Sequence, residues 1–226
     1  MERHTSKEFE AELVLLRERI LAMGGRAEAQ LKTALEAVAN RDSELAQRVI
    51  DADDDIDNDE LEIDELAQRI LATRQPVASD LRFITMALKI VTDLERIGDL
   101  ASNIAKRAQE LVRTGGGNLL DFGPLGREVE QNLRDALDSF VKRDVDRAAK
   151  VIAADKEIDA LNAGLFKASI DLISAQPANA AWLLPLTSIA RSLERVGDHA
   201  KNLAEDVVFM VRGRDVRHRP PPKFGN

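Results

Sequence analysis

Acidic side chains recur in pairs four residues apart at four places in this sequence. The pairs are Asp53 and Asp57, Glu95 and Asp99, Asp155 and Asp159, and Glu194 and Asp198. Residues at positions i and i+4 lie on the same face of a helix. Two like charges placed that way repel each other by a few tenths of a kcal/mol in an isolated helix. Such pairs could therefore serve to bind a cation.

The spacing around a proline brings two of these pairs to one level. Asp57 precedes Pro76 by the same separation at which Glu95 follows it, and Asp53 and Asp99 are likewise equidistant from that proline along the chain. In an antiparallel helical hairpin, all four carboxylates would lie roughly 30 Å from the turn, at 1.5 Å per residue. This spacing does not fix the rotation of each helix about its axis, so the pairs could still face apart.

The second half of the chain repeats the arrangement around Pro177. Asp155 and Asp159 precede Pro177, and Glu194 and Asp198 follow it at nearly the same distances along the chain, with a difference of one residue. Four carboxylates within bonding reach cannot all stay ionised without a cation. Hard oxygen ligands suit iron, manganese or magnesium, with zinc as a further candidate, and several ions could share bridging carboxylates. The sequence therefore predicts a metal site in each half.

Nearby residues refine this prediction. Asn103 and Asn202 follow Asp99 and Asp198 by one helical turn and could supply oxygen ligands or hydrogen bonds to the ligands. His199 is the only imidazole near either site, and its counterpart in the first half is leucine. A histidine ligand required in both sites is therefore excluded.

An acidic, solvated helix face is the alternative interpretation. Residues 51–65 contain ten acidic residues and no basic one, so they cannot all be ligands. In the second half, Asp155 and Asp159 remain although most of the surrounding charges are absent. That selective retention favours metal binding over a general surface role, and both interpretations stay open.

Apolar residues recur at helical spacing through most of the chain, with no competing alternation typical of strands. Six helices are predicted. They begin near Thr5, after Asp42, near Ser79, near Pro124, after Asp144 and after Pro177, and the second, third and sixth end near Arg74, Arg113 and Arg212. The glycine-rich residues 115–118 form the only convincing linker.

The two halves of the chain repeat each other. With a shift of 102 positions, residues 41–57 match residues 143–159 at nine of seventeen positions. With a shift of 99, residues 94–105 match residues 193–204 at eight of twelve. Shared glycine, aspartate and asparagine positions indicate duplication, because similar helix composition alone does not produce them.

The predicted fold is all-α, with tandem duplicated three-helix bundles over residues 1–114 and 119–212. Short connections favour antiparallel packing of successive helices. Residues 213–226 form a basic, proline-rich tail that is predicted to be disordered. Gly24 and Gly25 predict a kink or a close backbone contact in the first helix, and Gly98 and Gly197 predict close helix packing.

Composition narrows the functional class. The 226 residues carry a net charge of −8, with a pI of about 5.1, which argues against nucleic acid as the main partner. There is no cysteine, so disulfides and thiolate metal sites are excluded. The longest uncharged run, residues 172–190, contains two prolines and is a poor membrane span. We expect a soluble cytoplasmic protein that meets a membrane only indirectly, through its partners.

The segments around the later acidic pairs closely resemble the PhoU family. They read DLERIGD at 93–99 and SLERVGDH at 192–199, and the segments QPVASDLR at 75–82 and MGG at 23–25 also look like that family. The resemblance covers about residues 6–211. One departure is Leu100, where the family pattern commonly has histidine, so the two sites are expected to differ in affinity or metal.

The resemblance implies two three-helix bundles with pseudo-twofold symmetry, and a regulatory protein rather than an enzyme. It implies negative control of the phosphate-starvation response through a phosphate-sensing histidine kinase and the ATPase of the high-affinity phosphate transporter. It also implies a homodimer. Some family members bind multinuclear iron or other metals through motifs that match the four acidic pairs here.

Two other functional classes compete with this one. A carboxylate-bridged di-iron enzyme needs Glu-x-x-His pairs, and no glutamate here is followed by histidine three residues later. A metal-free helical scaffold would bind partners through its helix faces alone. Elemental analysis of protein purified without chelator would distinguish such a scaffold from a metal-binding protein.

Overall fold

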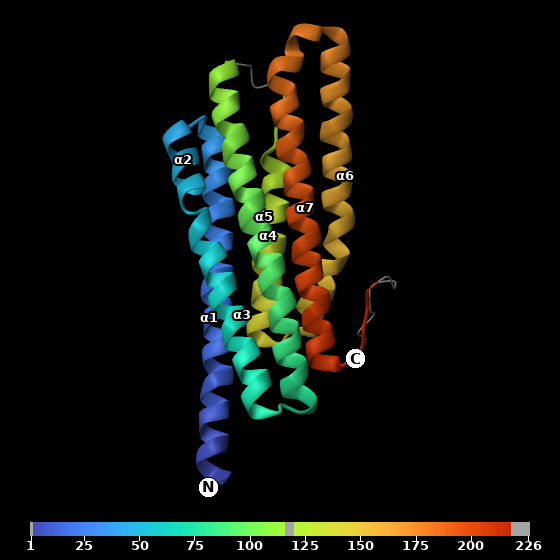
Figure 1. Cartoon of the computed structure of the whole chain (residues 1–226). Coiled ribbons are helices and arrows are strands. Elements are labelled where there is room, and N and C mark those ends of the chain that lie inside the picture. Colours follow the sequence, from blue (N-terminus) through green and yellow to red (C-terminus); the bar gives the residue numbers. More distant parts are fainter. Residues whose placement is uncertain (1, 116–119, 218–226) are drawn as a thin grey trace.

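The protein is an elongated bundle of long helices in the computed structural model, which describes residues 2–115 and 120–217 (Figure 1). The helices are α1 (Glu2–Asn40), α2 (Ser43–Asp51), α3 (Asp53–Arg74), α4 (Ala78–Thr114), α5 (Gly123–Lys142), α6 (Val145–Ala175) and α7 (Ala180–Arg212), with a 3₁₀ turn η1 (Pro177–Asn179) before α7. The described residues contain no strand. The all-α prediction is therefore confirmed.

Local side-chain chemistry explains several helix boundaries. The Asp42 carboxylate accepts hydrogen bonds from the backbone N–H groups of Glu44 and Leu45, both at 2.9 Å. The Asp144 carboxylate caps α6 in the same way, at 3.0 Å from the backbone nitrogen of Arg147. Both predicted caps are confirmed. The first helix starts at Glu2, before the predicted boundary at Thr5.

The second predicted helix is interrupted at Ala52, which the sequence did not predict. The Ala52 backbone N–H turns back to the carbonyl oxygens of Arg48 and Ile50, and α3 begins at Asp53. The Gln30 side-chain amide of α1 donates to the Ala52 carbonyl oxygen at 2.7 Å. In the second half, the counterpart of Gln30 is the shorter Asn132, and α6 continues without a break. α2 and α3 together therefore occupy the place of one predicted helix.

The two helix triplets pack into one structure. α4 lies against α7, and α1 contacts α5, so the central helices of both halves share an interface. Their apolar side chains form one continuous core. At the α1–α5 contact, a Cβ atom on Gly24 would lie 2.6 Å from Leu137 Cδ2, and one on Gly126 would lie 3.1 Å from Leu35 Cδ2. The expected close contact is therefore made by Gly24, whereas Gly25 faces open space.

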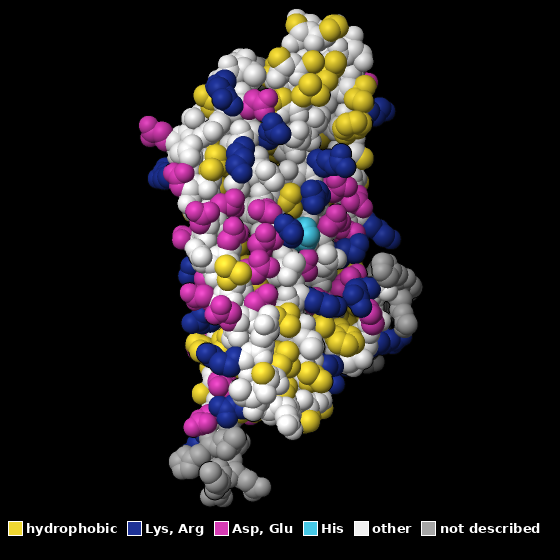
Figure 2. Space-filling model, in the orientation of Figure 1, with side chains coloured by type: hydrophobic (Ala, Val, Ile, Leu, Met, Phe, Trp, Pro, Cys, Tyr) yellow, Lys and Arg dark blue, Asp and Glu magenta, His cyan; other side chains and the backbone are white. Residues whose placement is uncertain are grey.

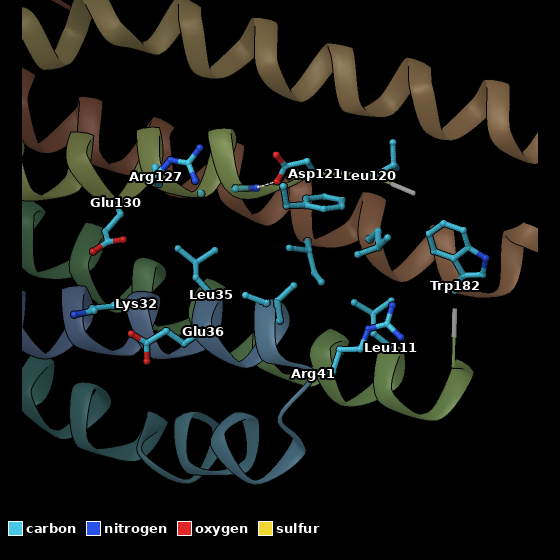
Figure 3. A pocket seen from close by; sticks show the side chains of 17 residues that line it. Lys32, Leu35, Glu36, Arg41, Leu111, Leu120, Asp121, Arg127, Glu130 and Trp182 are labelled. Atoms are coloured by element: carbon cyan, nitrogen blue, oxygen red, sulfur yellow. Dashed lines mark hydrogen bonds between the residues drawn. The ribbon is translucent and has the colours of Figure 1, made fainter. Parts of the chain in front are cut away.

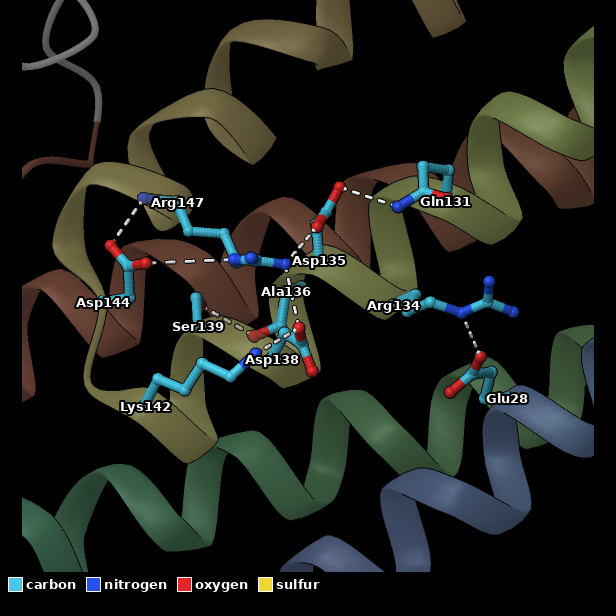
Figure 4. A network of polar contacts seen from close by, with 10 residues as sticks. All are labelled: Glu28, Gln131, Arg134, Asp135, Ala136, Asp138, Ser139, Lys142, Asp144 and Arg147. Carbon is cyan, nitrogen blue, oxygen red and sulfur yellow. Dashed lines mark hydrogen bonds and ion pairs between the residues drawn. The ribbon is translucent and has the colours of Figure 1, made fainter.

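Polar contacts reinforce this arrangement (Figure 4). Glu28 of α1 and Arg134 of α5 form an ion pair at 2.8 Å that links the two halves. At the α5–α6 turn, Arg147 pairs with Asp135 and Asp138, at 2.7 and 2.8 Å. These contacts hold the capped first turn of α6 against α5.

On the displayed face, acidic side chains occupy the middle and apolar side chains lie towards both ends (Figure 2). Acidic side chains gather across the middle of the displayed face. In the outer half of the α6–α7 hairpin, Phe166, Ile170 and Leu184 are 56%, 46% and 58% exposed. None of the described helices is both long enough and apolar enough to cross a bilayer.

Candidate metal centres

The first acidic cluster lies where α3 and α4 run side by side. Asp53 and Asp57 stand in the first two turns of α3, and Glu95 and Asp99 stand midway along α4. A Cβ atom on Gly98 would lie 2.9 Å from Ile56 Cδ1, so the absent side chain lets the two helices approach closely here. The expected role of Gly98 in close packing is confirmed.

The carboxylates of α3 and α4 affect one another's charge. The pKa of Asp53 is raised by burial and by the charges of Asp99 and Asp57. The pKa of Glu95 is likewise raised by burial first, and then by Asp99, Glu60 and Asp57. Asp53 and Asp57 of α3 thus lie within electrostatic range of Glu95 and Asp99 of α4.

Arg96 balances part of this negative charge. Its Nη1 lies 3.0 Å from Asp99 Oδ2, and its Nε lies 3.3 Å from Glu95 Oε2. The Glu95 Oε2 atom is buried and accepts no hydrogen bond, although it is ion-paired. Asn103 is exposed on α4. The first cluster therefore contains a buried carboxylate oxygen with unused bonding capacity.

The second acidic cluster repeats the first between α6 and α7. The pKa of Glu194 is raised by burial and by Asp198, Asp159 and Asp155. The pKa of Asp198 is raised by burial and by Asp155 and Asp159. Gly197 again allows close approach, since a Cβ atom there would lie 3.1 Å from Ile158 Cδ1. In both hairpins the two acidic pairs thus lie within electrostatic range of each other.

A lysine distinguishes the second cluster. Lys201 Nζ lies 2.5 Å from Asp155 Oδ2, and the Asp155 side chain is only 11% exposed. The hydrogen bond to Asp155 raises the pKa of Lys201, which keeps the amine charged. The counterpart of Lys201 in the first half is the buried Ser102. Sequence reasoning missed Lys201, which a comparison of the two repeats at this position would have found.

Comparisons with known proteins agree with this duplicated architecture. The family model for the PhoU domain matches the chain twice, over residues 20–108 and 123–207. The chain belongs to the PhoU family. It is 43% identical over 217 residues to the "Phosphate-specific transport system accessory protein PhoU homolog" of Pseudomonas aeruginosa, covering 95% of this chain and 90% of that one. Identity to the Escherichia coli K12 PhoU accessory protein is 38% over 219 residues, covering 96% and 91%.

Solved PhoU structures share the fold. The crystal structure of PhoU from Pseudomonas aeruginosa superposes with a TM-score of 0.88 at 42% identity, covering 91% of this chain and all of that one. The PhoU phosphate transport system regulatory protein of Streptococcus pneumoniae gives 0.82 at 30% identity, covering 92% and 99%. The predicted PhoU-like fold is confirmed.

In this PhoU-family chain, α4 and α7 contact each other through polar side chains that lie next to the two acidic clusters in the sequence. His199 Nδ1 lies 2.7 Å from Asp93 Oδ1, and the Asn202 side-chain amide donates to the same oxygen at 3.3 Å. Asp93 is two residues from Glu95, and His199 directly follows Asp198. Asn202, a predicted ligand or supporting residue of the second site, thus turns its amide group towards α4 instead.

Residues 2–115 and 120–217 contain no group of three or more acidic or histidine side chains already positioned to hold a metal ion. The donor set nevertheless fits hard cations, because each cluster offers four carboxylates and one buried glutamate oxygen in the first accepts no hydrogen bond. Binding would require Arg96 and Lys201 to release carboxylates that they now pair with. Because a different cationic side chain must be displaced in each cluster, the two clusters are expected to differ in their affinity for metal ions.

Proposed function

We propose that this protein is a negative regulator of phosphate uptake and of the phosphate-starvation response. It acts as a cytoplasmic, metal-binding helical adaptor, without enzymatic activity, between the ATPase of a phosphate transporter and a sensor histidine kinase. Family membership supports the phosphate role, since similar proteins are named as accessory or regulatory proteins of phosphate transport. The observation that supports the metal-binding role is that two acidic pairs in each half raise one another's pKa across a helical hairpin.

The regulatory role is tested in cells that carry a deletion of this gene. We expect phosphate-starvation genes to be expressed in rich phosphate, because the negative signal is lost. Co-purification from phosphate-replete cells should also recover a histidine kinase and a transporter ATPase. Repression that persists in the deletion strain would contradict the regulatory assignment.

The metal role is tested by substitution in one half at a time. Changing Glu95 and Asp99 together to alanine should remove the metal of the first half, measured by elemental analysis of protein purified without chelator. The metal-free protein should become slightly more stable, because the double change relieves the repulsion from Asp99 that adds to burial in raising the pKa of Glu95. The same double change at Glu194 and Asp198 tests the second half.

Chelation provides the corresponding measurement on the unmodified chain. A metal that binds only the folded form stabilises it by about 2.7 kcal/mol at a hundredfold excess over Kd. If chelator leaves the melting temperature of both the parent and the four-site variant unchanged, the protein is the alternative metal-free scaffold. A mass near 25 kDa by light scattering at tens of micromolar would contradict the homodimer that the family resemblance implies.

A further inference from the structure

The contact between α4 and α7 contains a polar cavity of about 430 Å³. The Asn202 amide of α7 lies 3.3 Å from Asp93 Oδ1 of α4, and Lys89 Nζ lies 3.9 Å from Asp206 Oδ1. Glu205 and Asp206 are only 9% and 6% exposed. Three of the side chains around the cavity are thus carboxylates. The polar lining that α4 and α7 contribute is Lys89, Thr92, Asp93, Asn202, Glu205 and Asp206.

A pseudo-twofold relation connects the two halves across their interface. A Cβ atom on Gly24 would lie 2.6 Å from Leu137 Cδ2, and one on Gly126 would lie 3.1 Å from Leu35 Cδ2. These two contacts are counterparts, because Gly24 and Leu35 correspond to Gly126 and Leu137 with the shift of 102 positions. The central helices α4 and α7 run in opposite directions (Figure 1). We therefore expect each contact between α4 and α7 to have a counterpart in which the two helices exchange roles.

The counterparts of the cavity residues carry the opposite charge. With the shift of 99 positions, the two buried carboxylates of α7 correspond to a lysine and an arginine of α4, and Thr92 corresponds to Arg191 of α7. Lys89 and Asp93 correspond to serines. We call this counterpart set the basic seam, and it consists of Asn103, Lys106, Arg107, Ser188, Arg191 and Ser192.

The cations of the basic seam face solvent. Lys106, Arg107 and Arg191 are all exposed, in contrast to the buried carboxylates of the cavity. Figure 2 shows lysine and arginine side chains on the displayed face between the acidic middle and the upper end. A dissolved ion can therefore reach these three cations directly.

Among the described residues, only one of these cations has a close acidic partner. Arg107 Nη1 lies 2.8 Å from Glu110 Oε2, and the two side chains are 50% and 36% exposed. Solvent screens such an exposed pair, so an anion can compete for the arginine. The other two cations form no ion pair with a described residue, although their charges act on Asp53 and Glu194 of the acidic clusters.

A second cavity of the molecule lacks this separation of charge (Figure 3). It has a volume of about 680 Å³ and lies between the end of α1, the start of α5 and the start of α7. Its charged lining is balanced, with three basic and three acidic side chains: Lys32, Arg41, Arg127, Glu36, Asp121 and Glu130. Separation of charge by sign is therefore a property of the α4–α7 contact and not of every cavity.

We propose that the basic seam binds a phosphate-type oxyanion. A guanidinium group donates two parallel hydrogen bonds that match phosphate oxygens, and a lysine ammonium group adds a point charge. The Asn103 amide and the serine hydroxyls supply uncharged donors beside the cations. The carboxylate cavity at the pseudo-symmetric position would repel the same ion, so the protein has one such site and not two.

Solvent exposure limits the affinity of this site. A few charge-assisted hydrogen bonds at an exposed position correspond to a dissociation constant on the order of 1 mM. The alternative role for these cations is to balance the charge of the neighbouring acidic clusters. That role predicts no saturable binding of phosphate.

Nuclear magnetic resonance of the full-length, chelator-treated protein tests the proposal. Inorganic phosphate is titrated at constant ionic strength, and the backbone amide shifts are followed. Chelator treatment excludes phosphate that is held by a metal ion. We expect saturable shifts at residues 103–107 and 188–192, and none around Asp206. A parallel titration with glycerol 3-phosphate distinguishes free phosphate from the phosphoryl group of a small metabolite, and the tighter of the two identifies the ligand.

Two matched double variants locate the binding. Lys106→Gln combined with Arg191→Gln should weaken phosphate binding by about tenfold or more, because two of the three cations are lost. Lys167→Gln combined with Arg69→Gln removes the same two kinds of charge from exposed positions on α6 and α3. This control should bind phosphate as the parent does. All four residues are exposed, and circular dichroism checks that both variants fold.

Either of two results would overturn the proposal. One is the absence of amide shifts at about 20 mM of either phosphate compound, roughly twenty times the expected dissociation constant. The other is equal affinity in the parent and in the seam variant.

The proposal deepens the phosphate role proposed above and rests on it for its biological meaning, since phosphate bound here would make the protein itself responsive to phosphate. The titration reports on the seam alone, whereas failure of the regulatory role appears in the deletion strain.

Discussion

Lys201 should weaken metal binding in the second half, and its removal tests the electrostatic account of that site. Its ammonium group lies 2.5 Å from Asp155 Oδ2, and its side chain is about one third exposed. A divalent cation that binds Asp155 must displace this amine. The first half places a neutral hydroxyl, Ser102, at the equivalent position. We therefore choose Lys201→Ser, which copies the first half.

The expected effect follows from the energy of a partly exposed ion pair. Such a pair contributes up to about 1 kcal/mol once solvent screening is included. Repulsion between the ammonium group and a bound cation adds to this, although the side chain can swing into water. A total of about 1.4 kcal/mol corresponds to a tenfold change in affinity. We expect Lys201→Ser to bind Mn²⁺ about ten times more tightly in the second half.

Isothermal titration with Mn²⁺ measures this effect on chelator-treated protein. The parent for the comparison carries alanine at Glu95 and Asp99, so that only the second cluster binds. Lys167→Ser is the matched control, because it removes the same charge from an exposed position on α6. Equal affinity in the parent and in Lys201→Ser, or an equal gain in the control, would refute the reasoning.

Three further predictions concern stability. Burial raises the pKa of Asp206 to about 6. Between about pH 4 and pH 6 the folded state therefore keeps a proton on this carboxyl that the unfolded state has lost, so the free energy of unfolding falls as pH rises through that window. Asp206→Asn should therefore stabilise the protein at pH 7.5 by about 2 kcal/mol in urea unfolding, and no gain would contradict the burial argument. Gly98→Ala should destabilise the protein by about 1–3 kcal/mol, because the added methyl group meets Ile56 at 2.9 Å. Gly25→Ala adds a methyl group in open space and should be neutral or stabilising. If the two variants change the free energy of unfolding equally, the close contact at Gly98 does not matter for stability. Asp42→Ala should cost about 1 kcal/mol through loss of the α2 cap, and thermal unfolding that matches the parent would show that the cap contributes nothing.

Much of the fold could be predicted from the sequence, because helical periodicity and capping residues act locally. Asp42 and Asp144 mark helix starts through their own hydrogen bonds, which depend on neighbouring residues only. The duplication could be read from the shared glycines and acidic residues. The domain boundaries at 1–114 and 119–212 remain predictions, although the structure shows one continuous core.

The features that the sequence did not predict depend on distant contacts. The break at Ala52 involves a glutamine 22 residues earlier in the chain, and the pairing of His199 with Asp93 joins residues 106 positions apart. The electrostatic coupling of the acidic pairs likewise depends on helix rotations that spacing around a proline does not determine. The identity of any bound metal is set by small differences among oxygen ligands, and it remains a prediction.

The packing of α4 against α7 has a consequence for hydrogen exchange. Because these two helices share one core, we expect the two halves to unfold together. The slowest-exchanging amides of both halves should therefore exchange through the same global opening, with one common free energy. A cation bound by the first cluster would then slow exchange in α6 and α7 as much as in α4, at residues far from the ion.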